Sequence, residues 1–231
     1  MGKAKGNINP ILITAIPRSG SSMIAGIFDI CGANCGTTLK EGKPYTQHLY
    51  ENQSIRSLVS YAFRDNLCDE RGQYPLPAKS FFLKNNFAET CNRIMAQQEV
   101  TGQWFYKDSR LLLFWEELNK QFPTAKWIVV LREEDHILRA CQKTAYMDAF
   151  SKTEVLEQIG KDNAVQGWKW WIQQHQDRIL GMEHSLNLKF IYPEKMGHGN
   201  FMEIKEVIEW AGLEWKDKEV RKFITPKLRR I

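Results

Sequence analysis

The segment Pro17-Arg18-Ser19-Gly20-Ser21-Ser22 brings a permanent cation, three hydroxyls and a glycine together. It follows the apolar run Ile11–Ile16 and precedes an apolar pattern with helical spacing, which predicts a loop between a strand and a helix. The first amides of a helix lack internal partners, and the helix dipole attracts negative charge. We therefore expect Ser19 to Ser22 to hold a phosphate or sulfate ester, with Arg18 supplying positive charge.

This segment differs from the nucleoside triphosphate loop G-x-x-x-x-G-K-[ST]. Ala15, Gly20, Ser21 and Ser22 stand where that loop has Gly, Gly, Lys and a hydroxyl residue. The absent lysine is the one that contacts the β and γ phosphates of a nucleotide. The loop therefore favours an ester that needs no magnesium ion between those groups, and we expect no metal.

Four short apolar runs are followed at once by polar or charged residues: Ile11–Ile16, Trp104–Tyr106, Lys126–Leu131 and Leu188–Tyr192. Long helical patterns separate these predicted strands. Such alternation is typical of a parallel sheet with right-handed helical crossovers, in which ligands bind at the carboxyl ends of the strands. The sequence predicts an α/β fold: a three-layer, P-loop-like domain with a central parallel sheet flanked by helices.

Length and composition set limits on the class of protein. The 231 residues suit one domain over 1–231, and the net charge of +5 suits a small polyanionic ligand better than a nucleic acid. The apolar runs are too short to cross a bilayer, and no signal peptide is apparent, so we expect a cytoplasmic protein. The five cysteines lack the spacing of disulfides or a zinc site, which predicts reduced and mostly buried thiols.

A helix is predicted over Lys161–Glu183, with Val165, Trp168, Ile172 and Ile179 on one face. The tryptophans at 168, 170 and 171 could stack on a sugar or base. Core packing is the favoured interpretation, above all for Trp168, because aromatic residues at this spacing usually fill cores.

A family resemblance now becomes visible. PRSGSS, between a strand and a helix, resembles the 5′-phosphosulfate loop of sulfotransferases that use 3′-phosphoadenosine 5′-phosphosulfate (PAPS) and release 3′,5′-bisphosphoadenosine (PAP). Many members have Lys where this chain has Arg18, whereas a large bacterial, viral and glycan-type branch has Arg. Further segments are similar to family segments in the same order: HLYENQSIRSLV, YKDSRLLLFWEELNKQFPTAKWIVVLREEDHIL, LKFIYPEKM and VIEWAGLEW.

The resemblance implies in-line, metal-independent transfer of a sulfuryl group to a hydroxyl or amine acceptor. It implies that Arg18 and Ser19, Gly20, Ser21 and Ser22 hold the 5′-phosphosulfate, with Arg18 stabilising charge on the bridging oxygen. The pocket for the acceptor, a small molecule or a glycan, would be shaped by the long loops within 36–80, since such loops are often functional.

The resemblance also implies that Arg132, after the third predicted strand, grips the 3′-phosphate of the donor. A planar guanidinium suits that contact because it meets phosphate oxygens two at a time. The family usually has Ser eight residues later, where this chain has Ala140, so the site would be completed by other cations: Arg139, Lys143, or Lys227, Arg229 and Arg230. The alternative role for Arg132 is a surface salt bridge with Glu133 or Glu134.

Three residues are candidates for the base that takes the proton of the acceptor: Glu51, His48 and Glu41. Glu51 ranks first because it matches the family-like segment. His48 ranks second, since imidazole is the base in the cytosolic branch and His48 would share a helical face with Glu51. The alternative for each is a solvated polar residue or a helix cap.

Lys107, Asp108 and Arg110 are predicted to begin the helix after the second strand. Lys107 lies at the carboxyl end of that strand and is a catalytic candidate. Asp108 can cap the helix, and for Asp108 and Arg110 both a structural and a catalytic role stay open.

Two other functions compete with sulfuryl transfer. A P-loop kinase or nucleotide hydrolase with a degenerate loop would need magnesium ligands, for which Asp108 is a candidate, but it lacks the K-[ST] pair. The other is a non-catalytic module that binds an adenine nucleotide or an acidic ligand.

Overall fold

A computed structural model of the chain describes residues 9–38 and 49–224. In this part, parallel strands form a sheet in the order β2-β1-β3-β4. The strands are β1 (Ile11–Ala15), β2 (Phe105–Lys107), β3 (Lys126–Val130) and β4 (Leu188–Ile191). Each lies within one or two residues of a predicted strand, so the expected α/β fold with a central parallel sheet is confirmed.

The central strand β1 is buried on both faces, which explains why all of its residues except Thr14 are apolar. Leu12 contributes to one hydrophobic cluster, and Ile11 and Ile13 contribute to a second cluster on the opposite face. This alternation follows from the period of two residues along a strand. It requires a covering layer on each face of the sheet.

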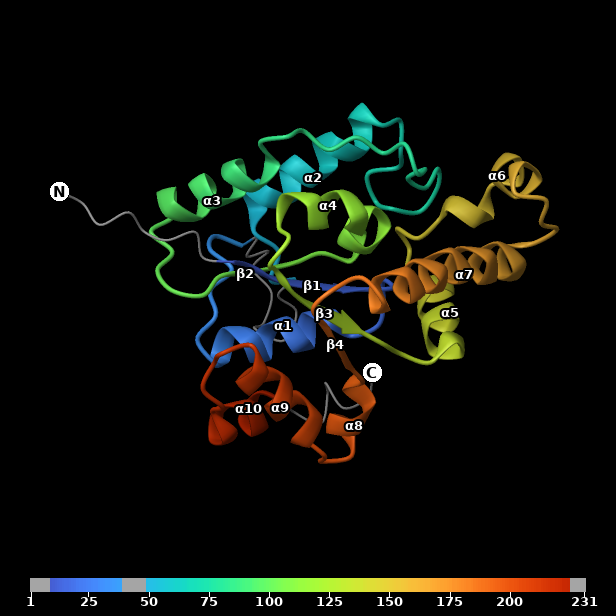
Figure 1. Cartoon of the computed structure of the whole chain (residues 1–231). Helices are drawn as coiled ribbons and strands as arrows, with labels where there is room; N and C mark the ends of the chain where they lie inside the picture. The colour runs from blue at the N-terminus through green and yellow to red at the C-terminus, as the bar shows by residue number, and fades with distance from the viewer. Residues whose placement is uncertain (1–8, 39–48, 225–231) are drawn as a thin grey trace.

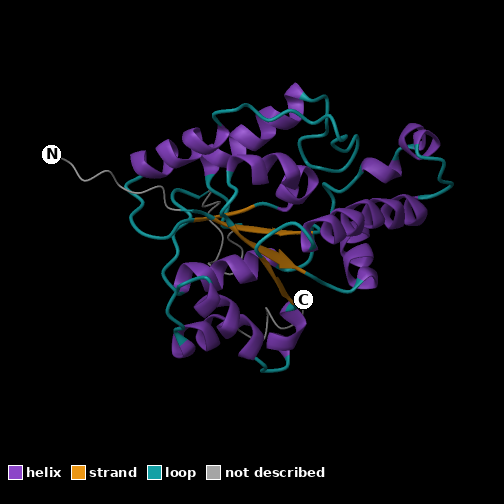
Figure 2. Ribbon diagram, in the orientation of Figure 1, coloured by secondary structure: helices purple, strands orange, loops and turns teal. Residues whose placement is uncertain are grey.

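Helices provide both layers (Figures 1 and 2). The first cluster is covered by α2 (Gln53–Asp65), α3 (Phe87–Gln97), α4 (Trp115–Gln121), α5 (Glu134–Lys143) and α7 (Ala164–Glu183). The second is covered by α1 (Ser21–Ile30), α8 (Pro193–Gly197), α9 (Met202–Trp210) and α10 (Asp217–Phe223). Shorter elements complete the described chain: η2 (Ser109–Phe114), η3 (Ala149–Ser151) and α6 (Thr153–Gln158).

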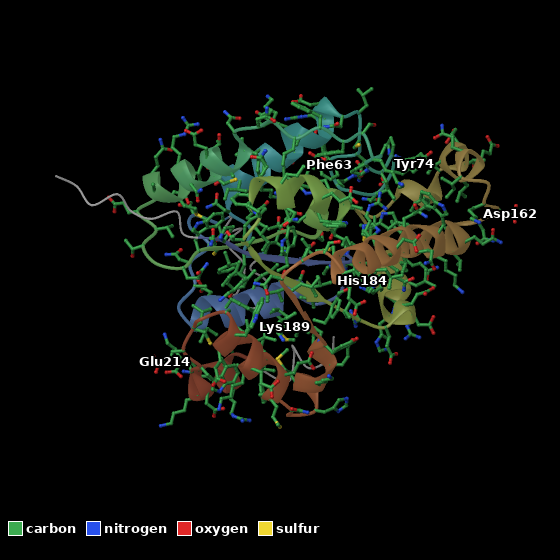
Figure 3. All side chains as sticks on the ribbon, viewed as in Figure 1. Phe63, Tyr74, Asp162, His184, Lys189 and Glu214 are labelled. Atoms are coloured by element: carbon green, nitrogen blue, oxygen red, sulfur yellow. The ribbon has the colours of Figure 1, made fainter. Side chains whose placement is uncertain are left out.

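The inner face of α2 is fixed by aromatic packing. Phe63, labelled in Figure 3, lies edge-on to Phe81 and Phe114, with ring centroids 5.5 and 5.6 Å apart. Ile55 and Val59 are buried along the same side of the helix. The opposite face of α2 is therefore free to carry polar residues.

Helix α7 begins at Ala164 rather than Lys161, after Asn163, whose side chain accepts a hydrogen bond from the Gln166 amide. Trp168 is buried edge-on against Phe150 and Trp171, which confirms core packing. The prediction for Val165 is wrong, because Val165 lies in the first turn, before the buried positions of α7 begin at Gly167, and its side chain is exposed.

The expectation of mostly buried cysteines is confirmed: Cys31, Cys35, Cys91 and Cys141 are buried, and no disulfide joins any of the five. Burial raises the pKa of the Cys35 and Cys141 thiols to about 12. No helix within residues 9–38 and 49–224 has the length and apolar character needed to cross a membrane.

Candidate active site

The loop after β1 leads into α1 through two residues with positive φ, Arg18 at 76° and Gly20 at 84°. Helix α1 begins at Ser21, as the predicted strand-loop-helix arrangement requires, and no side chain caps it. Its first internal hydrogen bonds run from the Met23 and Ile24 amides to the Gly20 carbonyl. The amides of Ser21 and Ser22 precede these bonds, at the positive end of the helix dipole.

Ser19 presents a buried hydroxyl in the same loop. Its side chain is fully buried, and its Oγ has no hydrogen-bond partner among the described residues. Ser19 and Arg132 line a groove of about 330 Å³ between the loop and α7. Because a buried hydroxyl without a partner is unfavourable, a ligand that accepts a hydrogen bond from Ser19 would satisfy it.

Arg132 follows β3 and faces the loop after β1. Its Nη1 donates a 2.7 Å hydrogen bond to the Arg18 carbonyl, and its Nε lies 3.4 Å from Glu194 Oε1. Burial lowers the pKa of Arg132, Glu194 opposes this, and the positive charges of Arg18 and Arg139 lower it further. Arg18, Arg132 and Arg139 therefore concentrate positive charge in one region of the site.

The expected alternative for Arg132, a salt bridge with Glu133 or Glu134, is wrong because the partner is Glu194. Glu194 lies in α8, just beyond β4, and β4 pairs with β3, so the ends of the two strands bring it to Arg132. Glu133 and Glu134 instead form the start of α5.

Helix α5 carries the other candidates for a second anion site. Arg139 is exposed, Ala140 is half-buried, and the Ala140 carbonyl accepts a 2.7 Å hydrogen bond from Thr144 Oγ1. Lys143 is exposed in the last turn. The terminal candidates Lys227, Arg229 and Arg230 lie outside the described residues.

Glu51 and Lys107 form an ion pair, with Lys107 Nζ 2.8 Å from Glu51 Oε1. The two side chains are 12% and 5% exposed, Glu51 being the more accessible. Glu51 Oε2 lies 3.0 Å from Arg56 Nε, so both oxygens of the carboxylate face cations. The structure thus brings together two of the predicted catalytic residues from distant parts of the chain.

Glu51 does not lie in a helix and does not cap one. Asn52 is the cap of α2, and its Oδ1 accepts hydrogen bonds from the Ser54 and Ile55 amides. The cap alternative for Glu51 is therefore wrong. The other two candidate bases, His48 and Glu41, lie outside the described residues.

Asp108 confirms the predicted capping role, because its Oδ1 accepts a 2.9 Å hydrogen bond from the Arg110 amide at the start of the 3-10 helix η2. The same carboxylate accepts hydrogen bonds from the Arg110 guanidinium and from the Tyr106 hydroxyl. Burial alone would raise the pKa of Asp108, but the charge and hydrogen bonds of Arg110 outweigh it and lower this pKa.

Two further residues contribute contacts to this region without matching any sequence motif. Arg56 contacts Glu51, and its signal was a cation five residues after a candidate base. Thr14 donates through Oγ1 to the Asp108 carbonyl and accepts from the Leu112 amide. Its signal was a lone hydroxyl within the apolar strand ILITA.

The sheet explains why these groups meet. Strands β2, β1 and β3 are parallel neighbours, so Lys107 at the end of β2, the loop at Arg18 after β1 and Arg132 after β3 lie along the same edge of the sheet. The edge presents cations and a helix N-terminus suited to an anion, beside a carboxylate suited to accept a proton. No group of three or more His, Cys, Asp or Glu side chains in the described part could hold a metal ion.

Comparison with known proteins adds two findings. The family model described as the sulfotransferase family matches residues 10–217 of this chain. The crystal structure of sulfotransferase STF9 from Mycobacterium avium is similar in fold, with a TM-score of 0.57 and 15% sequence identity, over 94% of this chain and 68% of that chain. Among curated proteins, none matches the sequence.

Proposed function

Because this chain belongs to the sulfotransferase family, we propose that it transfers a sulfuryl group from PAPS to a hydroxyl or amine acceptor, without a metal ion. The observation that carries the proposal is that the edge of the sheet suited to bind an anion lies next to the ion-paired carboxylate of Glu51. Arg18 and Arg132 are joined by a hydrogen bond at this edge, and Lys107, which pairs with Glu51, is the last residue of the neighbouring strand β2.

The donor would be held at two points. Arg18, the amides of Gly20, Ser21 and Ser22 and the free hydroxyl of Ser19 would bind the 5′-phosphosulfate. Arg132 would bind the 3′-phosphate, and Arg139, whose charge acts on Arg132, would assist it in place of the Ser that Ala140 replaces.

The reaction would be one in-line displacement. The acceptor oxygen or nitrogen forms a bond to sulfur while the bond between sulfur and the bridging oxygen breaks, and the electron pair of that bond leaves on PAP. Glu51 would receive the acceptor proton. Arg18 and Lys107 would stabilise negative charge at the reacting groups, and Lys107 also holds Glu51 in place through the 2.8 Å contact.

The first test is a thermal-shift titration with PAP, with 5′-AMP and with magnesium ATP. A ligand that binds only the folded protein raises its Tm, so we expect PAP to raise it well above AMP and magnesium ATP. Equal shifts for PAP and AMP would contradict a 3′-phosphate site, and preference for magnesium ATP would favour the kinase alternative.

A second test separates an enzyme from a binding module. The protein is incubated with PAPS and candidate acceptors, and release of PAP is followed. We expect release that depends on the acceptor. If PAP binds tightly but no acceptor causes PAP to form from PAPS, the non-catalytic alternative is favoured.

A further inference from the structure

A groove of about 380 Å³ runs along the exposed face of α2. It is lined by Gln53, Arg56, Ser57, Ser60, Tyr61 and Arg64 of this helix, and by Glu70. The helical residues share one face because they are three or four positions apart. At a rise of about 1.5 Å per residue, the strip from Gln53 to Arg64 is roughly 16 Å long, which suits an extended ligand.

One residue of the groove wall, Arg56, contacts the proposed catalytic base. Arg56 lines the groove, and its Nε lies 3.0 Å from Glu51 Oε2, while Glu51 Oε1 contacts Lys107. A ligand lying over Gln53 and Arg56 would therefore be separated from Glu51 by the Arg56 side chain alone. This continuity separates the groove from an ordinary surface hollow.

The floor of the groove is held by a buried guanidinium. Arg110, only 7% exposed, donates through Nη1 to Ser60 Oγ at 2.9 Å and to the Glu70 carbonyl at 2.8 Å. Its Nη2 lies 3.4 Å from the Arg56 carbonyl, and Asp108 fixes the other edge of the guanidinium. Both walls of the groove are thus tied to one rigid group, which keeps their spacing fixed before a ligand binds.

The charges in the groove are balanced. Arg64 lies 3.2 Å from Glu70, and Arg56 is paired with Glu51. The Arg64 guanidinium also lies 4.4 Å from the Tyr61 ring centroid, and Tyr61 is 56% exposed. A highly charged polyanion would find both cations already paired.

The chemistry of the lining selects among acceptors. An apolar acceptor would cover guanidinium, amide and hydroxyl groups without offering them hydrogen bonds, which is unfavourable. A hydroxyl-rich compound offers donors and acceptors together, and the Tyr61 ring provides a flat surface for its apolar faces. From these contacts we infer that the groove binds the acceptor and that this acceptor is an oligosaccharide, an inference that rests on the proposed sulfuryl transfer.

A second pocket of about 230 Å³, on the side of α2 next to the groove, has a different character. It shares Tyr61 but is formed largely by apolar residues, among them Leu58, Phe82 and Phe87. None of its lining residues forms a hydrogen bond or ion pair with Glu51 in the described part of the chain. An apolar acceptor placed there would lack a polar connection to the proposed base.

The test is binding of the full chain to an array of neutral and acidic oligosaccharides, with and without PAP, followed by titration with a length series of a retained glycan. Two variants remove groove side chains far from Glu51: Arg64→Ala and Tyr61→Ala. Arg93→Ala, an exposed arginine on α3, is the matched control. PAP affinity is measured for every protein.

We expect the wild-type chain to bind oligosaccharides more tightly as they lengthen, and each groove variant to weaken this binding roughly tenfold. The control and the PAP affinities should not change. The inference is overturned if the array retains no oligosaccharide, or if both groove variants bind as the wild type does. Absence of PAP binding would contradict the donor proposal alone, because the measurements without PAP still show whether the groove binds oligosaccharides.

Discussion

The guanidinium of Arg132 donates a 2.7 Å hydrogen bond to the main-chain carbonyl of Arg18. Arg132 follows β3 and Arg18 follows β1, and these strands are paired along their whole length. The bond fixes the distance between the two elements proposed to hold the two anionic groups of the donor. Each arginine can therefore be tested against a different part of one ligand.

Arg132→Lys should separate the two phosphate sites. Lysine keeps the charge but loses the planar fork that meets two phosphate oxygens, so PAP affinity should fall roughly tenfold or more while AMP affinity changes less. Isothermal titration with both nucleotides measures this. Equal losses for PAP and AMP would remove Arg132 from the proposed 3′-phosphate site.

Arg18→Ala should lower turnover by about 10²–10³, the usual effect of removing one positioned electrostatic donor. The measurement is acceptor-dependent release of PAP at saturating PAPS. Arg18→Lys, which restores a cation, should recover part of the rate. Near-normal turnover in Arg18→Ala would remove this side chain from the mechanism.

Glu51→Gln should leave PAP binding intact and lower turnover by about 10²–10⁴, because the neutral amide cannot accept the proton. Exposed Glu206, on α9, provides the control Glu206→Gln, which should retain full turnover. Full activity in Glu51→Gln would end its assignment as the base, and His48 would become the next residue to replace.

Asp108→Asn should destabilise the fold by about 3–5 kcal/mol, because it leaves the buried charge of Arg110 without its partner. The wild-type pKa of Asp108 is lowered, so its stabilising effect is complete above the ordinary aspartate value of about 3.9 and is lost as the pH falls through the folded-state pKa. Urea unfolding at pH 7 and pH 3 tests both points. A variant as stable as the wild type at pH 7 would contradict the role of this pair.

His175→Gln should flatten the acid side of the stability profile. Burial lowers the pKa of His175 to about 3, so the folded chain keeps it neutral while the unfolded chain takes up a proton below about pH 6.5. The free energy of unfolding should fall by about 1.4 kcal/mol for each pH unit from this source, between about pH 6 and pH 4. Glutamine removes this slope because its amide does not take up a proton in this pH range.

The control is exposed His184, labelled in Figure 3 just after α7. His184→Gln should leave the slope as it is in the wild type. Equal slopes for wild type and His175→Gln, from urea unfolding at each pH, would show that His175 does not contribute to acid unfolding.

Local patterns predicted the fold well where burial alone decides the structure. The strands at Ile11 and Lys126 are apolar because both faces of the sheet are covered, and the helix near Trp168 shows the spacing of a buried face. Val165 shows the limit of this reasoning. Its type fits the buried pattern, but its place in the first turn decides its exposure.

The site depends on contacts that no local pattern encodes. Glu51 and Lys107 are 56 residues apart in the chain and meet because the fold brings the residue two positions before α2 to the last residue of β2. Arg132 pairs with Glu194 rather than with its neighbours in sequence, because the order of the strands places α8 beside it. The residue types could therefore be predicted, but their partners required the topology of the sheet.

The groove along α2 lies apart from the proposed donor contacts, so specificity for the acceptor can change independently of donor binding. The proposed donor contacts come from β1, β3 and the elements after them, whereas the groove is built from one helical face and Glu70. Substitutions on that face leave the nucleotide contacts in place. Relatives could thus exchange one acceptor for another through a few surface changes on α2, and an engineer could transplant that face between family members without rebuilding the donor site.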